Sequence, residues 1–127
     1  MGGIFKAYDI RGIYGETINE DIVYRIGRAY VLKFKTKKIT IGRDCRISSP
    51  KLFEALVRGV TDQGCDVLDI GLVSTPMMYF SVWKFKHDGG IVITASHNPP
   101  KYNGLKMVRE DSIPIGGETG IYEIEEM

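Results

Sequence analysis

The stretch Gly90-Ile91-Val92-Ile93-Thr94-Ala95-Ser96-His97-Asn98-Pro99-Pro100 joins a buried strand to a stiff polar loop. Its first five residues are an apolar run, which is typical of a strand in the core of a sheet. The proline pair ends the strand, because proline cannot donate a hydrogen bond to a neighbouring strand. Ser96 is therefore expected at the exposed carboxyl end of a strand, where α/β sheets usually carry their chemistry.

Strands and helices alternate on both sides of this stretch. Apolar runs predict further strands at residues 38–42, 66–72 and 105–108. Capping residues predict three amphipathic helices, which begin at Asn19, at Ser49-Pro50 and at Thr75-Pro76. Strands that alternate with helices of this length predict an α/β fold, a layered α/β/α domain with a mostly parallel, mixed sheet.

The end of the chain is acidic and periodic. From Gly117 to Met127 the sequence predicts a helix that reaches the last residue without a glycine or proline to end it. We therefore expect residues 1–127 to be one domain that belongs to a longer protein.

Composition excludes several classes of partner. The chain has 127 residues, 43% of them hydrophobic, which is enough for one domain with its own core. Its 17 basic and 16 acidic residues nearly cancel, which argues against nucleic acid or a membrane surface as a partner. There is no apolar signal segment, and Cys45 and Cys65 are too few for a zinc site. A cytoplasmic protein with reduced thiols is expected.

Three polar segments each follow an apolar stretch: residues 7–12, residues 42–46 and the loop around Ser96. In a parallel sheet, segments after successive strands meet at one edge. Basic side chains are then expected around the serine, namely Arg11, Arg43, Arg46, His97, Lys101 and Lys106. Guanidinium groups match phosphate oxygens, so this cluster predicts a phosphorylated ligand or a phosphorylated serine.

The same residues have ordinary structural interpretations. Arg43-Asp44 alone is more often a loop salt bridge, and a lone Ser96 is more often a turn residue. Asn103-Gly104 would ordinarily form a tight hairpin turn before the next strand. A serine hydrolase is disfavoured, because no Gly-x-Ser-x-Gly elbow surrounds the serine. The residues by themselves predict an α/β domain with a candidate phosphate site.

The chain resembles the amino-terminal domain of the α-D-phosphohexomutases, the phosphomannomutase and phosphoglucomutase family. The run Thr94-Ala95-Ser96-His97-Asn98-Pro99, followed by Asn103-Gly104-x-Lys106, is similar to the active-serine signature of that family. Tyr8-Asp9-Ile10-Arg11-Gly12 and Gly42-Arg43-Asp44-x-Arg46 resemble two further family motifs in the right order. The resemblance covers essentially the whole chain, and the first motif favours mannose or glucose phosphates over glucosamine phosphate.

This resemblance implies that Ser96 is a phosphoserine that donates its phosphoryl group to a hexose monophosphate. The bisphosphorylated sugar turns around and returns its other phosphate, so that hexose 1-phosphate and hexose 6-phosphate interconvert. The implied catalytic residues are Ser96, Lys106 and Arg11, and the implied substrate- or phosphate-binding residues are Tyr8, Arg43, His97 and Asn98.

The resemblance also implies Mg²⁺ as a cofactor and a hexose 1,6-bisphosphate as activator. Within this chain only a phosphate oxygen on Ser96 would contact the metal, because the family's Asp-Gly-Asp-x-Asp loop is absent. The sugar-recognition loop and the carboxyl-terminal phosphate-binding domain are absent too. We expect an isolated chain without activity that needs the remaining domains and that self-associates through an exposed apolar interface. The alternative is a stand-alone phosphosugar-binding domain without catalysis.

Overall fold

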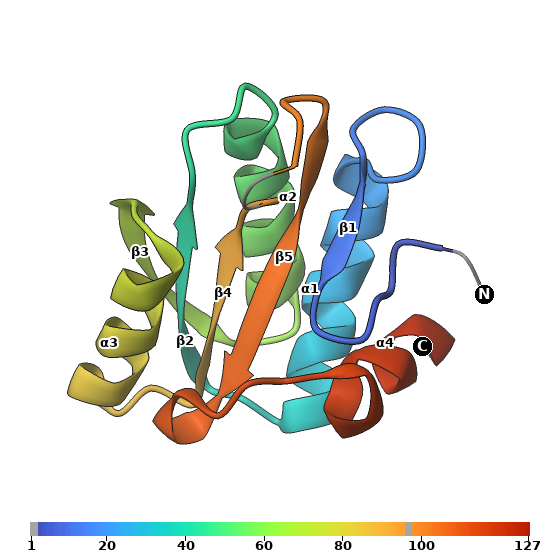
Figure 1. Ribbon diagram of the computed structural model, residues 1–127. Coiled ribbons are helices and arrows are strands. Elements are labelled where there is room, and N and C mark those ends of the chain that lie inside the picture. Colours follow the sequence, from blue (N-terminus) through green and yellow to red (C-terminus); the bar gives the residue numbers. More distant parts are fainter. Residues whose placement is uncertain (1–2, 96–97) are drawn as a thin grey trace.

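Five strands form a mixed sheet in the part of the chain that the computed structural model describes, residues 3–95 and 98–127 (Figure 1). In chain order they are β1 (Ile10–Ile13), β2 (Lys38–Arg43), β3 (Asp66–Leu72), β4 (Gly89–Ile93) and β5 (Tyr102–Arg109). Across the sheet the order is β1-β5-β4-β2-β3. Strand β2 is parallel to β3 and β4, whereas β5 is antiparallel to both β4 and β1. Strand β5 therefore runs against the direction of the other four.

Helices cover both faces of this sheet (Figure 1). They are α1 (Glu20–Phe34), α2 (Ser49–Asp62), α3 (Thr75–Phe85) and the short α4 (Tyr122–Glu126). Helices α1 and α2 pack side by side on one face and α3 lies on the other, which confirms the predicted α/β/α layers. Helical turns at Glu110–Ser112 and Gly117–Ile121 lead into α4 beside α1. Among the described residues, no helix has the length and apolar character that crossing a membrane requires.

The sheet separates two hydrophobic cores. The smaller core lies under α3 and is built from Met78, Val82, Val92 and Val108. The larger core joins the other face of the sheet to α1 and α2. Tyr30 of α1 is fully buried there and donates a hydrogen bond of 2.6 Å from its hydroxyl to the carbonyl oxygen of Val108. This bond ties α1 to β5.

Two predicted element boundaries agree with the structure. Asn19 caps α1, since its side-chain oxygen accepts a hydrogen bond of 2.9 Å from the backbone N–H of Ile22. Strand β3 spans Asp66–Leu72, which is the predicted range. Both signals are local in sequence, so tertiary packing does not alter them.

The predicted starts of α2 and α3 are each one residue late. The capping positions are Ser48 and Ser74, whereas Ser49 and Thr75 lie inside the helices. Each following proline therefore occupies the second helical position instead of the first. It is tolerated there because the first N–H groups of a helix have no partner within the helix.

The prediction that Asn103-Gly104 forms a hairpin turn is wrong, because both residues lie within β5. Gly104 faces β1, where an added Cβ would lie 1.9 Å from the carbonyl oxygen of Ile10. Asn103 is fully buried and donates hydrogen bonds of 2.8 and 3.0 Å to the hydroxyls of Ser48 and Ser49. Gly104 therefore allows β5 to pair closely with β1, and Asn103 anchors the start of α2.

Both cysteines are free thiols. Cys45 is exposed, whereas Cys65 is buried with its Sγ 3.3 Å from the hydroxyl of Thr36. Burial raises the pKa of the Cys65 thiol above its ordinary value, so this cysteine stays protonated at neutral pH.

We expect Tyr30→Phe to destabilise the domain by about 1–3 kcal/mol, because the carbonyl of Val108 would lose a buried hydrogen-bond donor. Urea unfolding followed by circular dichroism measures this loss. Tyr122→Phe, at a tyrosine that is 43% exposed, is the matched control and should change the unfolding midpoint little. Equal midpoints for the two variants would contradict the role given to Tyr30.

A buried polar cluster links β2 to the end of α3. His87 is 8% exposed, and its Nδ1 lies 2.8 Å from the hydroxyl of Thr40, which is itself 3.2 Å from the hydroxyl of Ser81. Burial lowers the pKa of His87, and nearby Lys38 lowers it further, whereas Asp88 opposes the shift. The folded protein therefore holds His87 neutral more strongly than the unfolded chain does.

This cluster predicts a loss of stability in mild acid. Above the ordinary histidine pKa of 6.5 the contribution of neutral His87 is fully present, and it is lost as the pH falls below that value, because the unfolded chain then binds the proton more readily. Urea midpoints measured between pH 7.5 and pH 5 test this. His87→Gln keeps a polar side chain without a titration, so its midpoint should fall less over that range. An equal fall of the urea midpoint in the wild type and in His87→Gln would contradict the prediction.

Candidate active site

Arg11 and Lys106 lie on the same face of the sheet. Arg11 on β1 is paired with Gly104 on β5, and Lys106 is two residues further along β5. Paired residues share a face, and so do alternate residues of one strand. Lys106 is also paired with Val92, which belongs to the core under α3. The two cations therefore lie on the α3 side of the sheet.

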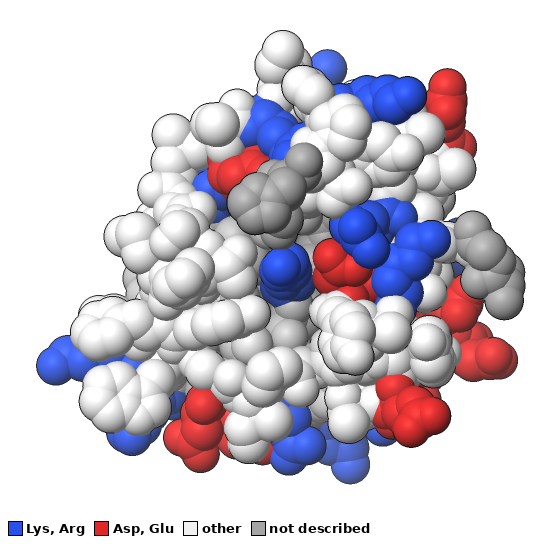
Figure 2. Space-filling model, in the orientation of Figure 1, with Lys and Arg blue, Asp and Glu red and all other residues white. Residues whose placement is uncertain are grey.

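This face is open where β5 and β1 lie. Helix α3 packs on β2 and β4, and among the described residues no helix stands in front of β1 or most of β5 in Figure 1. Figure 2 shows the same side with basic side chains gathered around a hollow near its centre. The side chain of Arg11 is 38% exposed and lies 3.1 Å from the carboxylate of Asp9, which is 11% exposed. The salt bridge orients Arg11 toward the edge of this surface.

The β4–β5 loop, residues 94–101, connects β4 to β5 and contains the predicted Ser96 and His97. Those two residues lie outside the described part of the chain. Ala95 and Asn98 flank them and are joined by two hydrogen bonds. The carbonyl oxygen of Ala95 accepts one of 3.0 Å from the backbone N–H of Asn98 and one of 2.7 Å from its side-chain amide. Asn98 thus holds the two described ends of the loop together.

A cavity of about 390 Å³ lies next to this loop. Arg11, Asn98, Lys6 and Tyr102 contribute to its wall. Cavities of this size commonly bind small molecules, and the two basic side chains suit an anionic ligand. Arg11 and Asn98 therefore line the same cavity.

Tyr8 and Arg43 are placed differently. Tyr8 is 87% exposed in the bend before β1. Arg43 is paired with Ile93, a residue of the core under α1 and α2, so it lies on the face opposite to Lys106. Its guanidinium is 4.5 Å from the centre of the Phe53 ring and 3.5 Å from a carboxylate oxygen of Asp69. Arg43 does not join Arg11 and Lys106, because the alternation of side chains along β2 turns it to the other face.

Arg46, which was expected beside the phosphate, is instead turned toward the backbone of the β4–β5 loop. Its guanidinium donates hydrogen bonds to the carbonyl oxygens of Asn98, Pro99 and Tyr102, at 2.8, 2.7 and 3.1 Å. The basic side chains that were expected together around the serine therefore lie in separate places. Arg11 and Lys106 occupy the open face, whereas Arg46 lies under the loop.

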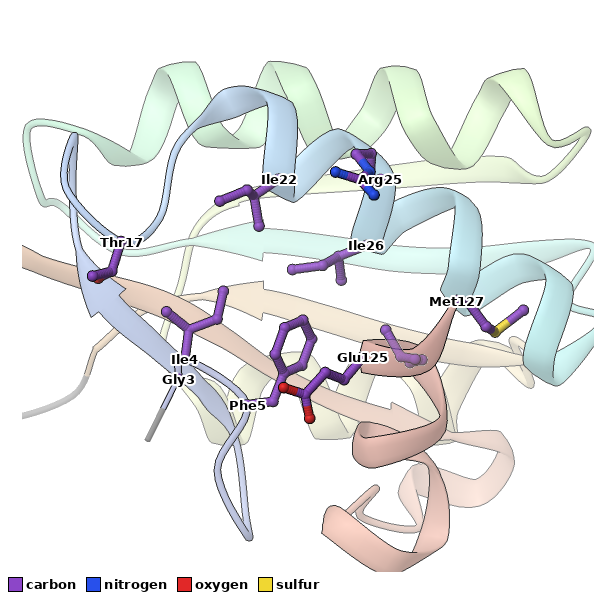
Figure 3. Close-up of a pocket in the computed structure, with 10 residues that line it drawn as sticks. Gly3, Ile4, Phe5, Thr17, Ile22, Arg25, Ile26, Glu125 and Met127 are labelled. Carbon is purple, nitrogen blue, oxygen red and sulfur yellow. The ribbon is translucent and has the colours of Figure 1, made fainter. Parts of the chain in front are cut away.

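A different cavity, of about 420 Å³, lies between the N-terminal segment, α1 and α4 (Figure 3). In Figure 3, Ile4 and Phe5 face Ile22 and Ile26 of α1. This largely apolar lining does not suit a phosphorylated ligand. Of these two cavities, the one beside Arg11 and the β4–β5 loop is the better candidate for the active site.

The described residues offer no metal site of their own. Within residues 3–95 and 98–127, no group of three or more His, Cys, Asp or Glu side chains lies close enough to hold a metal ion. Mg²⁺ prefers carboxylates together with phosphate oxygens. These residues alone do not fit a magnesium ion, and no step of a reaction is derived through one below.

Comparison with known proteins places this geometry in a family. Residues 2–127 match the model of phosphoglucomutase/phosphomannomutase, alpha/beta/alpha domain I. Phosphomannomutases of Klebsiella pneumoniae and Escherichia coli are each 55% identical over 123 residues, or 97% of this chain. The chain spans 78% of the first relative but only 27% of the second. The crystal structure of a phosphoglucomutase/phosphomannomutase family protein from Burkholderia thailandensis superposes with a TM-score of 0.87 at 39% identity, covering 97% of this chain and 30% of that one.

Proposed function

The chain belongs to the phosphoglucomutase/phosphomannomutase family as its α/β/α domain I, and we propose that it carries the phosphoserine of a hexose-phosphate mutase, Ser96. The reaction interconverts hexose 1-phosphate and hexose 6-phosphate of mannose or glucose through a bisphosphorylated sugar. The observation that supports the proposal is that Arg11 lines a cavity together with Asn98 of the loop that contains Ser96, and that Lys106 lies on the same face of the sheet as Arg11.

In the proposed reaction the phosphate on Ser96 passes to a free hydroxyl of the bound sugar monophosphate. The P–O bond to Ser96 breaks and a P–O bond to the sugar oxygen forms, and the proton of the sugar hydroxyl ends on the released Ser96 oxygen, which becomes a hydroxyl again. After the bisphosphate has turned around, its other phosphate returns to the Ser96 oxygen. Phosphoryl transfer depends mainly on positioning and charge stabilisation, which is what a protein surface of this kind can supply.

The basic side chains would neutralise the charge that moves in this reaction. A phosphoserine carries almost two negative charges, and a sugar phosphate adds as many again. Arg11 offers a planar guanidinium that matches two phosphate oxygens, whereas Lys106 offers a compact charge near the transferring group. Tyr8, His97 and Asn98 would orient the sugar or the loop. Arg43 remains a predicted phosphate ligand, although its position on the other face does not favour that role.

Two ligands complete the proposal. A phosphate oxygen of Ser96 would be this chain's contact to Mg²⁺, whose carboxylate ligands would come from another part of the protein. A hexose 1,6-bisphosphate would restore the phosphate on Ser96 whenever it is lost. Turnover would then need more than these 127 residues, and the chain alone would bind phosphosugar without catalysing its conversion. A cytoplasmic location fits such substrates.

The exposed apolar side chains of α3 support a contact with the remaining domains of the same protein. Met77, Phe80, Trp83 and Phe85 are between 53% and 60% exposed, and a cavity of about 390 Å³ opens beside them. Apolar groups gathered in this way usually mark an interface. In the isolated chain the same side chains would promote self-association.

In the complete mutase we expect Ser96→Ala to lower kcat by at least about a thousandfold, because the carrier of the phosphoryl group would be lost. The conversion of glucose 1-phosphate to glucose 6-phosphate measures this, with circular dichroism as the test of folding. Ser112→Ala is the control, since the hydroxyl of Ser112 bonds to the carbonyl of Tyr79, away from the site. Activity of Ser96→Ala close to wild type would exclude the carrier role.

Lys106→Ala should lower kcat by about a hundredfold and change the unfolding midpoint little, because the side chain is only partly buried on the open face. Steady-state kinetics and urea unfolding of the same preparation separate the two effects. Lys84→Ala, at an exposed lysine of α3, is the matched control. A variant that unfolds while the control does not would instead make Lys106 a structural residue.

A further inference from the structure

We propose that Arg46 is a positioning residue that fixes the backbone of the β4–β5 loop and does not itself bind the phosphate. The inference rests on the proposed function, because the loop contains the proposed phosphate carrier. By this inference, the arginine at the end of the Gly42-Arg43-Asp44-x-Arg46 motif supports the loop instead of binding an anion.

The guanidinium of Arg46 donates to three backbone carbonyls, two in the loop and one at the first residue of β5. Its Nη1 donates to the carbonyl oxygens of Pro99 at 2.7 Å and Tyr102 at 3.1 Å, and its Nη2 donates to that of Asn98 at 2.8 Å. These are charge-assisted hydrogen bonds, which are stronger than those between neutral groups. The side chain is only 12% exposed, compared with 38% for Arg11.

Asp44 orients this guanidinium. One carboxylate oxygen of Asp44 accepts a hydrogen bond of 3.1 Å from Nε of Arg46. The other accepts from the backbone N–H of Arg46 at 3.1 Å and from the hydroxyl of Ser49 at 2.7 Å. The same hydroxyl accepts a hydrogen bond of 3.0 Å from the side-chain amide of Asn103. The network therefore connects the β2–α2 loop, the first turn of α2 and strand β5.

Rigid elements thus hold the loop from two directions. Arg46 fixes the segment from Asn98 to Tyr102, and Asn98 in turn donates both of its hydrogen bonds to Ala95. On the other side, the backbone N–H of Asp44 donates to the carbonyl of Ile93 at 2.9 Å. Residues on both flanks of the proposed carrier are therefore anchored to the sheet.

Binding of phosphate by Arg46 would conflict with these contacts. A phosphate would have to displace backbone carbonyls from the guanidinium, and those carbonyls would lose charge-assisted hydrogen bonds in a partly buried place. Arg11 and Lys106 require no such exchange with loop carbonyls. Since phosphoryl transfer is sensitive to small displacements of the reacting groups, support of the loop is a sufficient reason for a buried arginine here.

Hydrogen exchange in the 127-residue chain tests the loop contact without any assumption about activity. In Arg46→Ala, the amides of Asn98 and Tyr102, which donate to Ala95 and Pro99, should exchange at least about tenfold faster than in wild type. The amide of Ile41 in β2, an interior strand of the sheet, should keep its rate. Unchanged exchange at Asn98 and Tyr102 would overturn the proposal.

Kinetics of the complete mutase test the consequence. Arg46→Ala should lower kcat by about a hundredfold with a KM for glucose 1-phosphate within about twofold of wild type. Added guanidinium ion at millimolar concentration should restore part of kcat, whereas Arg46→Lys should remain slow because an ammonium group lacks the planar fork. A raised KM with unchanged kcat would overturn the proposal in favour of direct ligand binding. Arg58→Ala, at an exposed arginine of α2, is the control.

The two experiments separate failure of this inference from failure of the proposed function. A wild-type mutase that converts no glucose 1-phosphate would overturn the proposed function, and hydrogen exchange would still decide the role of Arg46 in the loop. If Arg46→Ala does not fold by circular dichroism, Arg46→Lys is used in both experiments. Wild-type exchange and wild-type kcat in that variant would overturn the inference.

Discussion

The reversed direction of β5 is the constraint on which the rest of the structure depends. Because β5 is antiparallel to β4, a short loop at residues 94–101 is enough to connect them, whereas a parallel neighbour would need a crossover helix. Because Gly104 of β5 is in register with Arg11 of β1, Arg11 and Lys106 come to the same face. The same strand carries Asn103 under the first turn of α2. One strand thus joins the loop, the cations and the support beneath them.

The near-zero net charge of the chain conceals two kinds of arginine. Arg11 lies at an open surface beside one carboxylate and has room for a ligand, whereas Arg46 is almost enclosed and donates to backbone carbonyls. Both are charged, but only Arg11 can bind an anion without giving up hydrogen bonds to backbone carbonyls. The proposed roles of the two arginines, phosphate recognition and support of the loop, therefore follow from how buried each side chain is and not from the number of basic residues.

Much of the fold was predictable because its signals are short-range. The cap at Asn19, the strand at 66–72 and the alternation of strands and helices follow from neighbouring residues. The hairpin interpretation of Asn103-Gly104 failed because a glycine that suits a turn also suits a strand position where a neighbouring backbone comes very close. The close approach of β1 to Gly104 cannot be predicted from the neighbouring residues in the sequence. The contacts of Arg46 with the loop backbone were not predicted for a related reason, since a motif identifies a side chain but not the direction in which it points.

The sequence by itself determined the α/β class, the family resemblance and the list of candidate site residues, because periodicity and short motifs depend on local order along the chain. Tertiary structure decided which of those residues meet. The face on which Arg43 or Lys106 lies follows from strand register, and the partners of Arg46 follow from how the β4–β5 loop packs over the β2–α2 loop. Pairing and packing join residues more than 50 positions apart, as Arg46 and Pro99 are, and no local pattern encodes such a contact.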